Sequence, residues 1–413
     1  MKTPVLLLFL SLSLSSSAQF DTLTHVNQVV KDLIVFDNKL FIGGNFTTLQ
    51  DSIHSYWSAY YDGTELIPQG VLIGGSGPRE FAVFDNELYA VGDFSWPFSA
   101  NTGVVKWNGG SWSQDEGTNW SHSNLLVDGN YLYEVADNDI IRRKTAGGSF
   151  QVFKDFSADS NVNIHEIVSY QGKLCVMGVF TQLEGVPVRN IALWNGTTWE
   201  ALGTGIASVP TKAIVYRNEL YVAGSFSEAG GITAKRIAKW NGTAWSDVGG
   251  SVTGNSWNGI RDLVPCGNLL FALGDFDAIG GQSADDIASW DGLHWTTYTF
   301  PHSENILGAG VEYNGRLYVG GWNFTLSHIY GYTGNFLALN EYAATPLEIY
   351  PNPSNGVFYL KNSTQQSYEV RNALGQLVFS GNDAVIDLSE EENGVYLVRM
   401  ASGEAIRVVK NKN

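Results

Sequence analysis

The sequence predicts an all-β protein with a seven-bladed β-propeller followed by a small Ig-like β-sandwich. Three observations carry this prediction. A unit of four short strands recurs along most of the chain, Gly-rich turns separate the strands, and no long segment with helical periodicity follows the N-terminus. The 413 residues include 46 Gly and 13 Trp, and only 16% are charged, against about 25% in ordinary soluble domains.

The clearest copy of the unit is Thr211–Gly249, which contains the strands AIVY, ELYVAGSF, RIAKW and AWSDV. Arg217-Asn218 lies between the first two strands and predicts a two-residue hairpin turn. Asn241-Gly242 lies between the last two and predicts the same kind of short connection. A lone four-stranded sheet has two faces to bury, so a repeated unit is expected.

The unit recurs at intervals of 42 to 50 residues, the spacing of propeller blades. A leucine of the second strand marks each copy: Leu40, Leu88, Leu132, Leu174, Leu220, Leu270 and Leu317. Gly-x-Phe follows that strand in five copies, and Trp pairs five residues apart bracket the last hairpin in four, at Trp107/Trp112, Trp194/Trp199, Trp240/Trp245 and Trp290/Trp295. We count seven repeats, and the sequence leaves a ring of six or eight open.

The N-terminal segment has the pattern of a secretory signal peptide over residues 1–18. Lys2 precedes an apolar run, and Ser16-Ser17-Ala18 is a small-residue cleavage pattern, so the mature chain is expected to begin at Gln19. The apolar run is too short to span a membrane. The net charge of −17 argues against nucleic acid or an anionic membrane as partner.

The propeller is expected to cover residues 19–342. Phe20–Leu23 is placed to add an outermost strand to the last blade, which would remove exposed strand edges. Phe336–Asn340 competes for that position, and the sequence does not decide between them. Cys175 and Cys266 fall in blades that are not neighbours, so two buried thiols are expected rather than a disulfide.

A basic residue followed by an acid occurs at the head of the first strand in four repeats: Lys31-Asp32, Arg79-Glu80, His165-Glu166 and Arg261-Asp262. Because strand residues alternate between faces, one member of each pair should face the central channel and the other a neighbouring blade. The structural interpretation is a set of inter-blade salt bridges. The functional interpretation is a ligand or ion site at the channel mouth.

Aromatic residues outside the repeat frame collect on one predicted face, formed by the loops between second and third strands and between blades: Trp96, Trp120 and Trp257. Long loops collect such residues without a function. Exposed aromatic rings also supply stacking area for a carbohydrate or a peptide.

The C-terminal segment, residues 343–413, opens with a Pro-rich linker and continues as short alternating strands. It resembles the C-terminal sorting domain of type IX secretion system substrates of Bacteroidota over Leu347–Asn413. The resemblance rests on an ordered motif set: Tyr350-Pro351-Asn352-Pro353-Ser354-Asn355-Gly356, Tyr368–Val378 with Gly375, Asn393-Gly394-Val395-Tyr396, and a basic end at Lys410. It implies export, interaction with the secretion machinery and a sortase, and a secreted or surface-attached product.

The repeat region resembles kelch and galactose-oxidase-central propellers through Leu-Tyr-Val-x-Gly-x-Phe and Ile-Ala-x-Trp-Asn-Gly-x-x-Trp. Kelch's paired Gly is present at Gly43-Gly44 and Gly320-Gly321 and mostly absent elsewhere. No copper constellation, His-Glu-x-x-His or Gly-x-Ser-x-Gly motif occurs. We therefore predict no catalytic residue and no cofactor, and leave a structural cation in the channel open.

The predicted function is a secreted or surface-attached, non-catalytic binding propeller whose ligand is a glycan or a protein. Two alternatives remain. One is a glycan-active enzyme that uses acids among Asp32, Glu80, Glu166 and Asp262, whose separation would decide its mechanism. The other is a structural surface component without a discrete ligand.

Overall fold

The structure is a computed structural model, and it describes 15 segments that begin at Phe20 and end at Asn411. These segments are 20–50, 52–69, 73–75, 77–96, 102–117, 122–254, 259–298, 306–322, 327–332, 348–352, 354–361, 368–372, 377–381, 385–400 and 405–411. Strands and their connections make up all of them, without a helix. It follows that no helix in these segments could cross a membrane. The predicted signal peptide lies outside the described residues.

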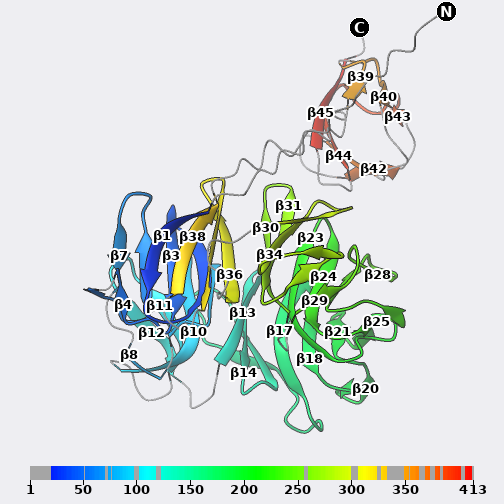
Figure 1. Ribbon diagram of the computed structural model, residues 1–413. Coiled ribbons are helices and arrows are strands. Elements are labelled where there is room, and N and C mark those ends of the chain that lie inside the picture. Colours follow the sequence, from blue (N-terminus) through cyan, green and yellow to red (C-terminus); the bar gives the residue numbers. More distant parts are fainter. Residues whose placement is uncertain are drawn as a thin grey trace, which may run out of the picture. The chain divides into compact units, whose positions relative to one another are not determined.

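Contacts divide the chain into two compact units, the first formed by Met1–Ser123 with Gly249–Gly334 and the second by Asn124–Val248 with Asn335–Asn413. In each unit the four strands of a repeat lie side by side in one antiparallel sheet, as the sequence predicts (Figure 1). The all-β prediction is confirmed.

The first unit contains four such sheets and two smaller additions. The strands are β2 (Val30–Phe36), β3 (Lys39–Gly44), β6 (Ser58–Tyr61) and β7 (Leu66–Pro68); β9 (Glu80–Phe84), β10 (Glu87–Trp96), β11 (Thr102–Trp107) and β12 (Trp112–Gly117), with β8 (Ile73–Gly75) on β10; β30 (Ile260–Cys266), β31 (Leu269–Gly274), β34 (Ile287–Trp290) and β35 (Trp295–Thr297); and β36 (Ile306–Tyr313), β37 (Arg316–Trp322), β38 (Ser327–Tyr332) and β1 (Phe20–Val26), with β4 (Thr48–Leu49) and β5 (Ile53–His54) continuing from β1. A further small sheet joins β29 (Val252–Thr253), β32 (Ala278–Ile279) and β33 (Gln282–Ser283).

The Asn124–Val248 part of the second unit contains three repeat sheets and two short hairpins. The strands are β13 (His122–Asp128), β14 (Tyr131–Ala136), β15 (Ile140–Lys144) and β16 (Gln151–Asp155); β17 (Asn163–Tyr170), β18 (Lys173–Val179), β21 (Ile191–Trp194) and β22 (Trp199–Ala201); β23 (Val209–Tyr216), β24 (Glu219–Ser225), β27 (Ile237–Trp240) and β28 (Trp245–Asp247); and the hairpins β19 (Gln182–Leu183) with β20 (Val186–Pro187) and β25 (Glu228–Ala229) with β26 (Ile232–Thr233).

The first strand of each repeat sheet is its inner strand, because these strands pack against one another from sheet to sheet. In the first unit β30 packs on β36, β36 on β2, and β2 on β9. In the second unit β17 packs on β23. Buried apolar side chains of adjacent sheets form shared cores, for example Val30 and Ile42 with Ala309 and Ile329.

The two predicted turns of the Thr211–Gly249 unit have different outcomes. Arg217 and Asn218 have φ of 48° and 64°, as a two-residue turn of the predicted kind requires. The second prediction is wrong in length. Trp240 pairs with Trp245, so four residues form that loop, and the Asn241 Oδ1 accepts the Thr243 and Ala244 N–H groups at 2.9 Å each. The asparagine side chain stabilises a longer turn than the Asn-Gly pair alone indicates.

The Trp pairs are cross-strand neighbours in the register of their hairpins. Ring centroids are 5.4 Å apart in Trp107/Trp112 and 5.3 Å apart in Trp290/Trp295, with tilted or edge-to-face geometry. Such aromatic pairs contribute about 0.5–1.5 kcal/mol beyond the area they bury.

The N-terminal strand β1 is the fourth strand of the last repeat sheet. It pairs antiparallel with β38, from Phe20 opposite Tyr332 to Val26 opposite Ser327 (Figure 1). The first of the two predicted closing strands is therefore observed. The competing segment, Phe336–Asn340, lies outside the described residues.

Cys175 and Cys266 are free and buried, as predicted. Burial raises the pKa of both thiols, that of Cys266 to about 12. Neither therefore carries the thiolate that reactivity needs near neutral pH.

The C-terminal segment forms two antiparallel sheets with one shared core. One sheet orders β39 (Glu348–Tyr350), β40 (Val357–Lys361) and β43 (Val385–Asp387), and the other orders β42 (Leu377–Gly381), β41 (Tyr368–Asn372), β44 (Gly394–Met400) and β45 (Ala405–Lys410). Phe358 and Ile386 from the first sheet and Val370 and Val398 from the second are buried together. The short strands expected from the alternating pattern are therefore observed.

Candidate ligand-binding site

Two of the predicted acids connect the inner strands of successive sheets. The Asp32 Oδ1 accepts the Leu33 N–H at 2.9 Å and its Oδ2 accepts the Phe81 N–H of β9 at 2.6 Å. Asp262 repeats this arrangement, with the N–H groups of Leu263 at 2.9 Å and of Gly310 in β36 at 3.0 Å. One contact of each acid thus goes to a backbone amide of the next sheet, whereas the structural interpretation expected salt bridges.

The predicted pair in the second unit also reaches its neighbour. The Lys212 Nζ donates to the Glu166 Oε1 at 3.3 Å, and the His165 Nδ1 lies 3.0 Å from the Pro210 carbonyl. Both partners belong to β23, so this pair does form an ion pair between sheets. Glu80, the fourth acid, is half-buried at the start of β9.

The basic members of the pairs differ from one another in ion pairing and burial more than the acids do. Arg79 forms an ion pair with Asp93 of its own sheet. Burial, and after it the Arg79 guanidinium, lower the pKa of Lys31 to about 8 against the opposing effect of Asp93. Arg261 is exposed. Arg261 lines a pocket.

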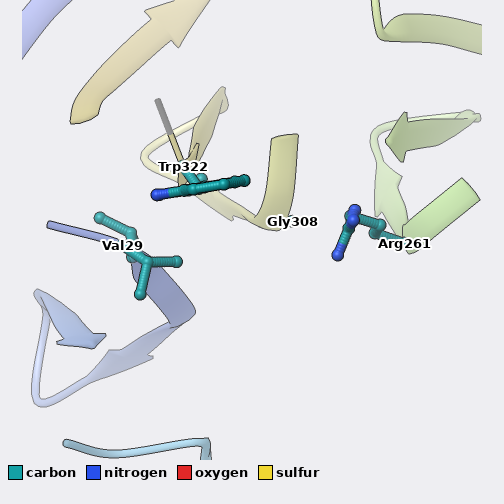
Figure 2. A pocket seen from close by; sticks show the side chains of 6 residues that line it. Val29, Arg261, Gly308 and Trp322 are labelled. Carbon is teal, nitrogen blue, oxygen red and sulfur yellow. The ribbon is translucent and has the colours of Figure 1, made fainter. Parts of the chain in front are cut away.

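That pocket has a volume of about 320 Å³ and is lined by Val29, Val30, Arg261, Gly308, Gly321 and Trp322. Figure 2 shows Val29 and Arg261 on opposite sides of the pocket, with Trp322 and Gly308 between them. The lining residues come from the starts of inner strands and the end of β37, which places the pocket on the face where the aromatic residues were predicted. We call it the Trp322 pocket.

The Trp322 pocket arises from two departures of the last repeat from the common pattern. Gly308 stands nine residues before Leu317, the position that Lys31, Arg79 and Arg261 occupy in their own repeats. Trp322 stands five residues after Leu317, where the second repeat has Asp93, the partner of Arg79. A missing side chain and an added indole together make a cavity with an aromatic wall.

Gly308 is not required by the fold. A Cβ built on it would meet only the Arg261 Cδ, at 3.9 Å, and its φ lies outside the left-handed region. Other repeat glycines behave differently, since a Cβ on Gly274 would lie 1.9 Å from the Gly259 carbonyl oxygen. The open space above Gly308 is thus available to a ligand.

Of the aromatic residues predicted on this face, the structure describes only the backbone of Trp96. Trp120 and Trp257 are outside the described residues. Trp96 is in β10 with its backbone opposite Ile73, and its side chain is outside the described set. Trp322, with 39% of its surface exposed, is the aromatic residue that sequence reasoning missed. Aligning the repeats on their leucines would have found it, because no other repeat has an aromatic residue at that position.

A larger hollow of about 720 Å³ lies at the opposite ends of β2 and β9, around Asp37, Lys39 and Glu87. The charged groups there already pair within the fold, Lys39 with Asp37 at 2.9 Å and Glu87 with Lys106 at 3.0 Å. It therefore offers less unengaged charge to a ligand than the Trp322 pocket does.

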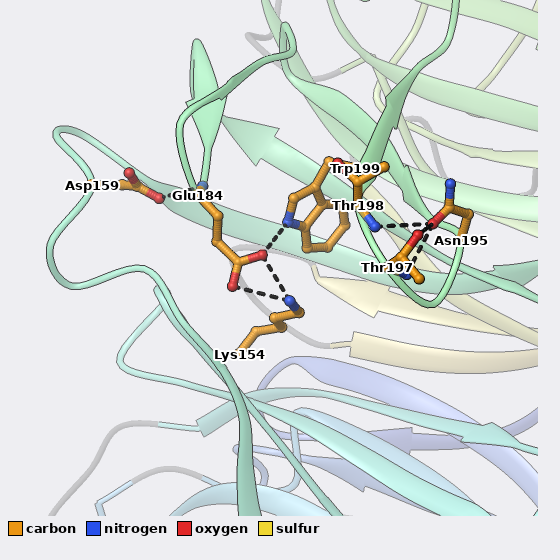
Figure 3. A network of polar contacts seen from close by, with 7 residues as sticks. All are labelled: Lys154, Asp159, Glu184, Asn195, Thr197, Thr198 and Trp199. Atoms are coloured by element: carbon orange, nitrogen blue, oxygen red, sulfur yellow. Dashed lines mark hydrogen bonds and ion pairs between the residues drawn. The ribbon is translucent and has the colours of Figure 1, made fainter.

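A network of polar contacts between β16 and β22 holds two neighbouring sheets together (Figure 3). The Lys154 Nζ lies 3.3 Å from the Trp194 ring centroid and 2.7 Å from the Glu184 Oε2, which also accepts the Trp199 indole N–H at 2.9 Å. The cation comes from one sheet and both aromatic rings from the next, and together with the counter-ion they satisfy one another. These charged groups therefore already have partners within the fold.

Metal binding has no candidate cluster among the described residues. The predictions of no catalytic residue and no cofactor, and the open question of a channel cation, therefore stay predictions.

The predicted sorting residues that are described hold the end of the last strand. The Asn352 Oδ1 accepts the Val409 N–H at 2.9 Å, and the buried Lys410 Nζ donates to the Ser389 carbonyl at 2.8 Å and to that of Glu391. Gly356 has a φ of 133°, and a Cβ there would lie 2.8 Å from the Ser389 Cα. Gly394 opens β44, while Pro353 and Gly375 lie outside the described residues. The motif residues thus tie the first and last strands of the segment together.

The family described as Secretion system C-terminal sorting domain matches residues 348–411. The C-terminal segment is a type IX sorting domain. A tail of this type implies export to the cell surface or secretion, and contact with the type IX machinery.

Solved structures similar to the chain include two that align at low identity. The extracellular domain of a proposed one-component system from B. thetaiotaomicron has a TM-score of 0.53 and 12% identity over 95% of this chain and 59% of that one, so the chain spans under two thirds of its length. The WD40 β-propeller domain of Doa1 has a TM-score of 0.50 and 12% identity over 76% of this chain and 97% of that one. These likenesses support a β-propeller fold. No curated protein matches the chain in sequence.

Proposed function

We propose that this chain is an exported binding protein, a seven-bladed propeller that holds its ligand in the Trp322 pocket and is delivered by an Ig-like sorting domain. Cleavage after Ala18 would leave Gln19 at the N-terminus, directly before β1. The ligand is extracellular, and the protein acts without catalysis.

The observation that carries this proposal is the pairing of Gly308 with Trp322. The last repeat lacks a side chain where three others have a basic one, and it presents a half-exposed indole beside the space. A cavity of about 320 Å³ with an apolar wall and one charged residue has the composition of a small-ligand site.

The enzyme alternative has less support. A glycan-active enzyme needs carboxylates that converge on a substrate, while Asp32 and Asp262 accept backbone amides and Glu166 pairs with Lys212. The structural alternative would leave the Trp322 pocket without a role.

The test measures binding of the full chain to an array of polysaccharides, oligosaccharides and extracellular proteins. Gly308→Leu should fill the pocket and weaken binding by tenfold or more, and Trp322→Ala should weaken it similarly. Gly110→Leu is the matched control, because a Cβ at that exposed glycine meets nothing closer than 4.0 Å. Binding unaffected by Gly308→Leu would move the site elsewhere, and turnover of a bound glycan would replace the binding function with an enzymatic one.

A further inference from the structure

The charge around the Trp322 pocket indicates which class of ligand it accepts. The chain has a net charge of −17, yet the repeat position that frames the pocket is basic in the three other repeats of the first unit, at Arg261, Lys31 and Arg79. The pocket lies between two of these strands, because β36 packs against β30 on one side and β2 on the other. Arg261, the charged residue named in the lining of the pocket, favours an anionic ligand on this strongly acidic protein.

Arg261 is the group that would meet this anion. Arg79 is engaged by Asp93, whereas Arg261 forms no ion pair with any described residue and lines the pocket with its exposed side chain. The side chain lies against Gly308, whose missing Cβ leaves the guanidinium access to the cavity. A guanidinium binds a carboxylate through two parallel N–H donors.

The second recognition element is the indole of Trp322. Its ring lies along the wall of the pocket between Val29 and Arg261, so a ring-shaped ligand can stack on it while an acidic substituent reaches Arg261 (Figure 2). About 320 Å³ lies near the lower end of small-ligand pockets, which favours a single ring-sized group over an extended chain. A bound peptide strand would instead need an unpaired strand edge beside the pocket.

We infer that the Trp322 pocket binds a carboxylate-bearing sugar unit of a glycan, with the ring on Trp322 and the carboxylate on Arg261. This inference rests on the proposed function and narrows its ligand to acidic carbohydrate.

The experiment compares two probes that share a sugar ring and differ in charge: oligogalacturonate and its fully methyl-esterified form. Isothermal titration with the full-length wild type should show the acid binding at least tenfold more tightly than the ester. Arg261→Gln should reduce that preference to under threefold, and Arg261→Lys should restore part of it. A sulfated oligosaccharide tests whether any anion suffices, and binding as tight as the uronate would overturn the carboxylate assignment.

The variants separate failure of this inference from failure of the proposed function. If Gly308→Leu removes binding of acid and ester alike while Arg261→Gln changes neither, the pocket is the site but acidic sugar is not its ligand. If Gly308→Leu leaves uronate binding intact, both proposals fail. Absence of uronate binding by the wild type, with a neutral glycan or a protein bound at the pocket, overturns the inference alone. An acidic peptide that binds the pocket in place of any glycan does the same.

Discussion

Asp286 occupies a repeat position that another sheet fills with an amide. Asn190 and Asp286 each precede an Ile-Ala-x-Trp strand, with φ of 61° and 66°. Each side-chain Oδ1 accepts the N–H of the Gly-x-Phe phenylalanine at 3.0 Å, from Phe180 and Phe276 respectively. The Asn190 Nδ2 also donates to the Ile206 and Ser208 carbonyls, which an ionised carboxylate cannot do.

This comparison predicts that Asp286→Asn stabilises the protein at neutral and alkaline pH. Burial raises the pKa of Asp286 from 3.8 to about 7. Between those values the folded state holds a proton that the unfolded state has released, so rising pH lowers the stability of the wild type until the penalty levels off above pH 7. The expected gain is about 1–3 kcal/mol at pH 8 after allowance for partial exposure, and it shrinks toward pH 4.

Thermal unfolding of both forms from pH 5 to pH 8 measures this effect. Asp285→Asn is the control, because its exposed neighbouring side chain should give little change at any pH. A gain for Asp286→Asn that is constant with pH would contradict the assignment to ionisation.

The sequence predicts the orientation of some site residues but not the partners that they contact. Alternation within a strand correctly indicates that one member of each charged pair faces the next sheet, and Asp32 does so. It could not reveal that the partner is the Phe81 backbone N–H, since that depends on the packing distance between sheets. The sequence indicates a special role for Gly308 only when the repeats are aligned with one another, because an isolated glycine in a strand has many explanations.

In five repeats the Gly-x-Phe glycine lies in the last part of the second strand, where the chain at the start of the paired inner strand passes too close for a side chain. A Cβ on Gly44, Gly178 or Gly274 would lie 1.9–2.1 Å from a carbonyl oxygen of the segment just before the inner strand. These values are far below any real contact, so backbone must move to admit a methyl group. The Gly-x-Phe motif thus fixes the spacing between the first two strands of a blade.

Gly178→Ala is therefore expected to destabilise the protein by about 1–3 kcal/mol, the range for overpacking with a backbone shift. Gly308→Ala is the matched control, since its Cβ would meet nothing closer than 3.9 Å, and it should change stability by under about 0.5 kcal/mol. Chemical denaturation of the two variants beside wild type gives the comparison. Equal stability of the two would show that the strands can separate at no cost.

The length of the turn could be predicted for one hairpin of the repeat and not for the other. Arg217-Asn218 adopts the positive φ values that a two-residue turn needs. At Asn241 the same kind of signal accompanies a four-residue loop, because the side chain accepts two backbone N–H groups and the Trp240/Trp245 pair fixes the strand register. Local sequence identified the hairpin, and cross-strand aromatic packing determined its length.

The N-terminal strand connects the start of the propeller to its last repeat. Strand β1 supplies the fourth strand of the sheet that contains β36, β37 and β38, with the Phe20 and Tyr332 rings 5.2 Å apart. Thr24 and Val26 are buried there. Without β1, the edge of β38 would be exposed and open to pairing with other chains. The sequence offered two candidates for this position, because either apolar segment can pair with an edge strand and only tertiary register distinguishes them.

Removal of residues 20–26 should therefore lower the stability of the repeat region by more than about 4 kcal/mol and cause aggregation. Thermal unfolding and size-exclusion chromatography of the mature chain with and without these residues test this. A circular permutant provides the control: Phe20 lies opposite Tyr332, so a short turn can join the end of β38 to β1 as a hairpin. Because the permutant restores the same strand pairing from the other end of the chain, it should recover a monomeric, cooperatively unfolding protein. If the truncated chain instead unfolds at the wild-type temperature, then another segment, with Phe336–Asn340 the first to examine, can supply the fourth strand, and the closure of the propeller does not depend on its N-terminus.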